Sequence, residues 1–219
     1  MATNTREQNI HHYIMCESIL SMDLNSVIFY DDEWISYNDG VYQINWLNEN
    51  RNSETNNMQQ LGVWWNKSGI IEYFVRPSTS FTSALFYNSF TNADLKLRHS
   101  HDSTRQYNLI VDFTKPEFTV DTYKYIRARN YKILSLPAES ERDSPTRFYL
   151  FRNFNRFIQH KSKKYNGDIT KAMEDFRGKD PAFFEEGIVT FTDNCMRYCN
   201  RGRRSAEVPE INPICHMEC

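Results

Sequence analysis

Apolar residues recur with helical spacing near the start of the chain. Ile10, Tyr13 and Ile14 follow this spacing between residues 4 and 22, and Asn4 is a typical N-cap residue. The apolar positions spread over most of the helix circumference, so the predicted helix is either tucked into its own core or covered by a neighbouring molecule. We predict that Ile10, Tyr13 and Ile14 contact other molecules.

Alternating apolar and polar residues predict strands from residue 27 to residue 118. Residues 38–40 (Asn-Asp-Gly) and 66–69 (Asn-Lys-Ser-Gly) each lie between two alternating segments, which predicts two hairpins. Further strands are predicted at 107–113, 118–125, 131–136 and 147–151.

The pattern becomes helical after residue 167. Asp168 is predicted to cap a helix that ends at Gly178, and an apolar stripe from Ile188 to Tyr198 predicts another. Repeated short strands with turns between them are typical of sandwiches. We therefore predict an α+β, mainly β protein: an antiparallel β-sandwich with an N-terminal helical arm and C-terminal helices. The expected arm is 1–24, and the expected single domain is 25–219.

Composition places the chain among globular proteins. Of its 219 residues 40% are hydrophobic, 15% are aromatic and 25% are charged. No apolar run approaches the length of a transmembrane helix, and the first residues have no apolar signal core. We expect no signal peptide and no membrane partner.

Charge is distributed unevenly. The first 94 residues hold four Lys and Arg against eleven Asp and Glu, and the remainder holds 22 against 17. Three explanations stay open: nucleic-acid binding by the basic part, attraction between copies of the chain, or an uneven solvated surface.

Three segments could carry chemistry. His99 and His101 would share one side of a strand, which suits a metal or phosphoester acid–base work, or else they form a polar edge. Residues 147–164 interleave cations with aromatic rings, which suits stacked bases and phosphates, or else an aromatic core side with a solvated basic side. Residues 31–33 (Asp-Asp-Glu) either hold a cation or form a solvated acidic turn.

Two stretches of the chain resemble a known family. One runs from residue 97 to residue 137 and contains Leu109-Ile110-Val111-Asp112-Phe113-Thr114-Lys115-Pro116. The other is Cys195-Met196-Arg197-Tyr198-Cys199-Asn200-Arg201. Both are similar to segments of the polyhedrins of cypoviruses, insect viruses that embed their particles in protein crystals.

The resemblance implies a structural matrix protein that self-assembles through trimers into intracellular crystals around virus particles. It implies no catalytic role, no metal and no required cofactor, with trapped nucleotides allowed. It implies a location in viral inclusion bodies of the host-cell cytoplasm. The alternative function is a nucleic-acid-binding or phosphoesterase protein that uses His99, His101 and residues 147–164.

A protective crystal has to dissolve in an alkaline insect gut, and tyrosine titrates near pH 10. A tyrosine buried at a contact resists ionising, so alkali should disperse the assembly. The pH-sensitive candidates are Tyr13, Tyr30, Tyr87, Tyr123 and Tyr149.

Overall fold

The computed structural model describes residues 6–38, 41–45, 58–77, 83–100, 105–112, 118–136 and 144–205. The strands are β1 (Val27–Asn38), β2 (Val41–Asn45), β3 (Met58–Asn66), β4 (Gly69–Pro77), β5 (Tyr107–Val111) and β6 (Tyr131–Ser135). The helices are α1 (Arg6–Leu20), η1 (Leu24–Ser26), α2 (Ser83–Ser100), α3 (Val120–Arg127), η3 (Thr146–Phe151), α4 (Arg152–His160), α5 (Ser162–Tyr165), α6 (Ile169–Arg177) and α7 (Pro181–Ser205).

All six strands belong to one mixed sheet. Its order is β4-β3-β1-β5-β6, and β2 also pairs with β1. The pairs among β1, β2, β3 and β4 are antiparallel, whereas β1, β5 and β6 run parallel. Parallel neighbours need a crossover between them, and helix α3 supplies the one from β5 to β6.

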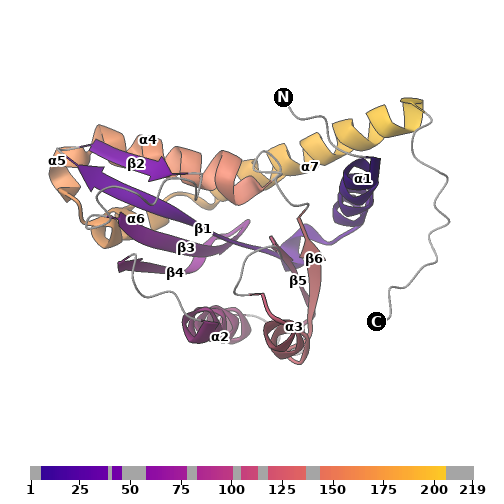
Figure 1. Cartoon of the computed structure of the whole chain (residues 1–219), viewed down its shortest axis with the longest axis horizontal. Coiled ribbons are helices and arrows are strands. Elements are labelled where there is room, and N and C mark those ends of the chain that lie inside the picture. Colours follow the sequence, from indigo (N-terminus) through magenta and orange to yellow (C-terminus); the bar gives the residue numbers. More distant parts are fainter. Residues whose placement is uncertain are drawn as a thin grey trace.

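Helices cover both faces of the sheet (Figure 1). The C-terminal helices and α1 lie on one face, and α2 and α3 lie on the other. Each face has its own apolar core, because successive side chains of a strand point to opposite sides. Val27, Phe29 and Ile35 of β1 enter the first core, and Ile28 and Tyr30 enter the second.

The predicted antiparallel sandwich is wrong. The chain does mix helices and strands, and it does have an N-terminal helix and C-terminal helices, but its strands form a single sheet with three parallel members. Helices, not a second sheet, bury the two faces. The boundary expected between an arm and a domain at residue 24 stays a prediction.

Local signals for several elements are confirmed. The hairpin around residues 66–69 joins β3 to β4, with Gly69 at a positive φ of 142°. Strand β1 pairs with β2 as the first hairpin requires, although residues 39–40 lie outside the described residues. Asp168 caps α6 by accepting a hydrogen bond from the backbone N–H of Lys171 at 2.9 Å, and Gly178 follows that helix.

Three segments differ from the prediction. Residues 118–125 were predicted to be a strand, but Thr119 caps helix α3 by accepting from the N–H of Thr122 at 3.2 Å. Residues 147–151 form a π-helical turn that leads into α4 instead of a strand. Helix α2 was not predicted at all, because residues 27–118 were interpreted as strands throughout.

Helix α1 packs along α7 within the chain (Figure 1). Its buried residues Met15, Cys16 and Ile19 belong to the core on that face. Of the predicted intermolecular contacts, Ile10 is half-buried, Tyr13 packs against the same core, and Ile14 is 45% exposed. Whether these three touch other molecules stays a prediction.

Among the described residues, no helix is both long enough and apolar enough to cross a membrane.

Candidate functional site

Along one edge of β1, the neighbouring strand changes in the middle of β1. Strand β3 pairs with one edge of β1 over residues 29–36. On the opposite edge, β5 pairs with residues 27–29 and β2 pairs with residues 34–38. Neither β5 nor β2 therefore pairs with residues 30–33 of β1, which include Asp31, Asp32 and Glu33.

Asp31 and Glu33 are buried in this part of β1, at 2% and 4% exposure. Both point to the face that holds η3 and the C-terminal helices, as odd-numbered residues of β1 do. Asp112 directly follows β5. Strand β5 pairs with β1 up to Phe29↔Ile110, and Asp112 comes two residues after Ile110, as Asp31 comes two residues after Phe29.

Arg147 enters this acidic group from η3. Its Nε lies 3.1 Å from Oδ2 of Asp31 and 3.0 Å from Oε1 of Glu33, and its side chain is 16% exposed. Ser144 donates its hydroxyl to the same Asp31 oxygen at 2.9 Å. The other oxygen, Oδ1, accepts the backbone N–H of Asp32 at 2.9 Å. Both oxygens of Asp31 thus have protein partners.

A tryptophan positions the segment that carries Arg147. The indole N–H of Trp65 donates to Oγ1 of Thr146 at 2.9 Å, and both residues are buried. Thr146 immediately precedes Arg147, so this hydrogen bond ties η3 to β3. The start of η3 is therefore fixed against the sheet at the point where the acidic residues lie.

Asp32 points to the opposite face of the sheet. It accepts a hydrogen bond from Nε2 of Gln60 at 2.7 Å and a long one from the hydroxyl of Tyr30 at 3.4 Å. The run 31–33 is therefore not the solvated acidic turn that was one sequence interpretation, because all three residues are buried within a strand.

The basic and aromatic residues of 147–164 separate onto two sides of a helix. Leu150, Phe151, Phe154 and Ile158 are buried in the core. Five cations are exposed, and one of them, Lys164, pairs with Asp175. We call the other four the basic face: Arg152, Arg156, Lys161 and Lys163. This matches the interpretation of an aromatic core side with a solvated basic side, but on a helix instead of a strand. Arg147 differs from these cations because it lies in the acidic group.

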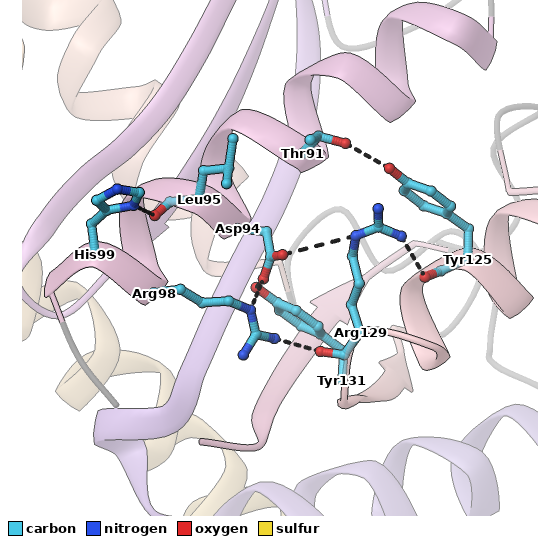
Figure 2. Close-up of polar contacts among 8 residues, drawn as sticks. All are labelled: Thr91, Asp94, Leu95, Arg98, His99, Tyr125, Arg129 and Tyr131. Atoms are coloured by element: carbon cyan, nitrogen blue, oxygen red, sulfur yellow. Dashed lines mark hydrogen bonds and ion pairs between the residues drawn. The ribbon is translucent and has the colours of Figure 1, made fainter. Parts of the chain in front are cut away.

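His99 is exposed at the end of α2, on the other face of the sheet from Arg147. Its Nδ1 lies 2.8 Å from the backbone carbonyl of Leu95, one helical turn earlier (Figure 2). His101 lies outside the described residues. The predicted pairing of the two imidazoles on a strand is wrong for His99, because the segment is helical.

Next to His99, Asp94 joins three elements (Figure 2). This buried carboxylate accepts from Nε of Arg98 at 2.7 Å and from the hydroxyl of Tyr131 at 2.8 Å. Arg129 approaches its second oxygen at 3.9 Å, and Arg98 also donates to the carbonyl of Arg129. The group holds α2 against β6 and against the turn that precedes β6, and both oxygens of Asp94 face protein groups.

The tyrosines chosen as pH sensors occupy unlike environments. Tyr30 is buried, Tyr13 and Tyr87 are half-buried, and Tyr123 is 41% exposed. The Tyr149 hydroxyl donates to the carbonyl of Phe183 at 2.7 Å and contacts Glu186 at 3.1 Å. Desolvation, followed by the hydrogen bond to Glu186 and its charge, raises the pKa of Tyr149. Their role in dissolving an assembly is not tested by these positions.

We expect the fold to lose stability above about pH 10, with Tyr131 as a main contributor. Burial raises the pKa of Tyr131, and the charge of Asp94 and the hydrogen bond to it raise the pKa further. The stabilisation is fully present below the unfolded-state pKa of about 10 and falls as pH rises towards the higher folded-state value. Urea midpoints measured from pH 8 to pH 11.5 should show this fall.

Tyr131→Phe should reduce the alkaline fall, whereas Tyr123→Phe serves as the exposed control. An equal alkaline fall in the Tyr131→Phe protein would contradict the assignment.

The arrangement of sheet and helices matches a known class of structure. A search of family models found no match to this chain. Solved structures do match: the fold is that of the catalytic domain of the Mos1 mariner transposase. The crystal structure of the Mos1 mariner transposase catalytic domain superposes with a TM-score of 0.70 at 17% identity, covering 91% of this chain and 96% of that one.

Two further similar proteins extend this comparison. A Mos1 catalytic domain with raltegravir and Mn has a TM-score of 0.70 at 16% identity, over 97% of this chain and 100% of that one. The human histone-lysine N-methyltransferase SETMAR is 22% identical over 75% of this chain. The chain spans about a quarter of SETMAR, since the match covers 26% of that protein.

These findings overturn the resemblance to polyhedrins and what it implied. Proteins similar over most of the chain are a mariner transposase and SETMAR. Mos1 is also solved in a pre-cleavage transpososome and in a paired-end complex with a transposon end. The crystalline matrix, the trimer and virus partners, and the inclusion-body location are therefore wrong. The expectations of no catalytic role and no required cofactor rested on that resemblance and are corrected with it, since the similar Mos1 domains are described as catalytic and are solved with Mn or Mg.

The residues at the acidic group do not fit a divalent metal as they stand. Mg²⁺ is held by oxygen ligands at about 2.0–2.1 Å. Here the guanidinium of Arg147 contacts both buried carboxylates. Within the described parts of the chain, no group of three or more His, Cys, Asp or Glu could hold a metal ion. We therefore derive no reaction step through a metal.

Sequence reasoning gave no role to Asp112 and did not pair Arg147 with Asp31. One signal was available for the acids: the apolar runs Val27–Tyr30 and Leu109–Val111 each end directly at an aspartate. Two apolar runs that each lead directly into an aspartate suggest a site near the carboxyl ends of parallel strands, where ligands bind in open α/β sheets. No local signal identifies Arg147, which lies 116 positions from Asp31.

Proposed function

We propose that this chain is a nucleic-acid-processing domain of the transposase type and that it binds double-stranded DNA. The observation that carries the proposal is the superposition over almost the whole of a transposase catalytic domain, with a TM-score of 0.70. A related Mos1 chain, which matches 96% of this one, is solved in a pre-cleavage transpososome.

The chain offers a surface suited to this partner. The basic face, on α4 and the start of α5, directly follows the η3 segment that reaches the acidic group. Arg152 and Arg156 are four residues apart, so they project from the same side of α4. Exposed cations at such spacing attract phosphates, and this contact supplies most of the sequence-independent affinity for DNA.

Charge reversal on the basic face tests the proposal. The double variant Arg152→Glu with Arg156→Glu should weaken binding to a labelled DNA duplex at least tenfold near physiological salt. It should also reduce the slope of log affinity against log salt by about 2, one for each lost phosphate contact. Fluorescence anisotropy over a series of NaCl concentrations measures both quantities.

A matched control lies on the opposite face of the sheet. Lys124 and Arg127 are exposed on α3, and Lys124→Glu with Arg127→Glu changes the net charge by the same amount. The control should keep most of the affinity and the salt slope. If both double variants weaken binding equally, overall charge and not the basic face governs the interaction. No salt-dependent binding by the wild type would refute the proposal.

A further inference from the structure

Two buried carboxylates on one strand require a positive charge beside them. Asp31 and Glu33 are both nearly inaccessible and point to the same side of β1. An uncompensated buried charge is strongly unfavourable, so such groups are paired or bound to metals. In this chain the positive charge comes from the protein itself, through Arg147.

The position of Arg147 excludes a second cation. Its Nε is within 3.1 Å of one oxygen from each carboxylate, so it occupies the space that both oxygens face. A metal ion bonded to those oxygens would lie at about 2.0–2.1 Å from each and would collide with the guanidinium. It would also be repelled by a charge that arginine does not lose by deprotonation.

Neighbouring contacts hold Arg147 in this place. The Trp65–Thr146 hydrogen bond anchors the residue before it. The hydroxyl of Ser144, at the start of the same segment, donates to the Asp31 oxygen that Arg147 also contacts. Since Asp31 also accepts the N–H of Asp32, the carboxylate is oriented by the protein without a metal.

We propose that Arg147 is a built-in cation at the acidic site and that a divalent metal binds Asp31 and Glu33 only when Arg147 is removed or displaced. This inference deepens the proposed function and rests on it for the choice of metal, since the similar catalytic domains are solved with Mn or Mg.

Manganese binding tests the proposal without any measurement of activity. Titration of the full chain with MnCl₂, followed by the electron paramagnetic resonance signal of free Mn²⁺, gives the dissociation constant. Arg147→Ala should bind Mn²⁺ at least tenfold more tightly than the wild type. Mn²⁺ should also raise the Tm of Arg147→Ala, because the ion replaces the lost positive charge, and should leave the Tm of the wild type unchanged.

Three variants complete the experiment. Arg127→Ala, which removes an exposed arginine of α3, should bind Mn²⁺ as the wild type does. Arg147→Gln keeps hydrogen-bond donors and serves if the alanine variant does not fold. Asp31→Asn with Arg147→Gln should lose the gained affinity, which assigns the metal to this site.

Two results would overturn the proposal. One is equal Mn²⁺ affinity of the wild type and both Arg147 variants. The other is tight Mn²⁺ binding by the wild type that disappears on Asp31→Asn, because the metal would then bind with Arg147 in place. Duplex binding in EDTA, measured on the same proteins, separates this question from the proposed function: failure of the wild type to bind DNA refutes that function and leaves the metal result standing.

Discussion

Asp94→Ala is expected to lower the free energy of unfolding by about 3–5 kcal/mol, the usual cost of removing one partner from a buried ion pair. The substitution removes the acceptor of Nε of Arg98 and of the hydroxyl of Tyr131. It also removes the hydrogen bond from Tyr131 of β6 to α2 (Figure 2). Urea unfolding followed by circular dichroism measures the loss.

A second ion pair on α2 provides the control. Lys96 contacts Glu72 at 2.7 Å, but its side chain is 46% exposed. Exposed pairs contribute roughly 0–1 kcal/mol, so Lys96→Ala should change the stability by less than about 1 kcal/mol. A loss for Asp94→Ala no greater than that for Lys96→Ala would show that the buried group does not hold the helices together.

Trp65→Ala is expected to cost about 3–5 kcal/mol, as truncations of large buried aromatic residues do. The indole is fully buried, and its ring packs against Phe29 with centroids 5.0 Å apart. The variant loses this packing, leaves a cavity and removes the donor to Thr146. The same urea experiment measures the cost.

Trp65→Phe isolates the hydrogen bond from the packing. A phenyl ring keeps much of the contact with Phe29 but cannot donate to Thr146. We expect a smaller loss, about 1–3 kcal/mol, because the threonine hydroxyl is left buried without that donor. Equal losses for both variants would mean that the hydrogen bond, and not the packing of the ring, dominates the contribution of Trp65.

Elements with strong local signals could be predicted from the sequence. The β3–β4 hairpin has alternating apolar residues on both sides of a turn that ends in Gly69, and the structure places it there. Helix α6 has a capping aspartate at its start and a glycine after its end. Such features depend on a few neighbouring residues, so the chain context matters little.

The sequence of helix α2 contains a local signal for a helix that the strand prediction did not use. Its buried residues Phe86, Phe90, Ala93 and Leu97 recur at helical spacing, but the segment lies between predicted strands and contains many aromatic residues. Aromatic residues favour strands when they are considered without their spacing. In residues 118–125 the alternation of apolar and polar residues predicts a strand, whereas Thr119 is a typical helix N-cap. The structure has the helix that Thr119 caps, α3.

The sheet topology and the acidic site depend on contacts between distant residues. The parallel pairing of β1 with β5 joins residues about 80 positions apart, and a list of strands does not specify it. Arg147 and Asp31 are separated still further. In the sequence, Arg147 was one cation among many, and only the folded chain distinguishes it from the exposed arginines of α4.

Adjacent tryptophans on β3 point into different cores of the protein. Trp64 packs with Tyr30 and Phe86 on the side of α2, and Trp65 packs with Phe29 on the side of α7. Their indoles are therefore two fluorophores, one residue apart, that sample opposite layers. The unfolding of each layer can be followed by fluorescence in variants in which only Trp64 or only Trp65 remains as the emitting tryptophan. Coincident transitions would mean that the two layers unfold as one cooperative unit, and separate transitions would mean that one layer unfolds first.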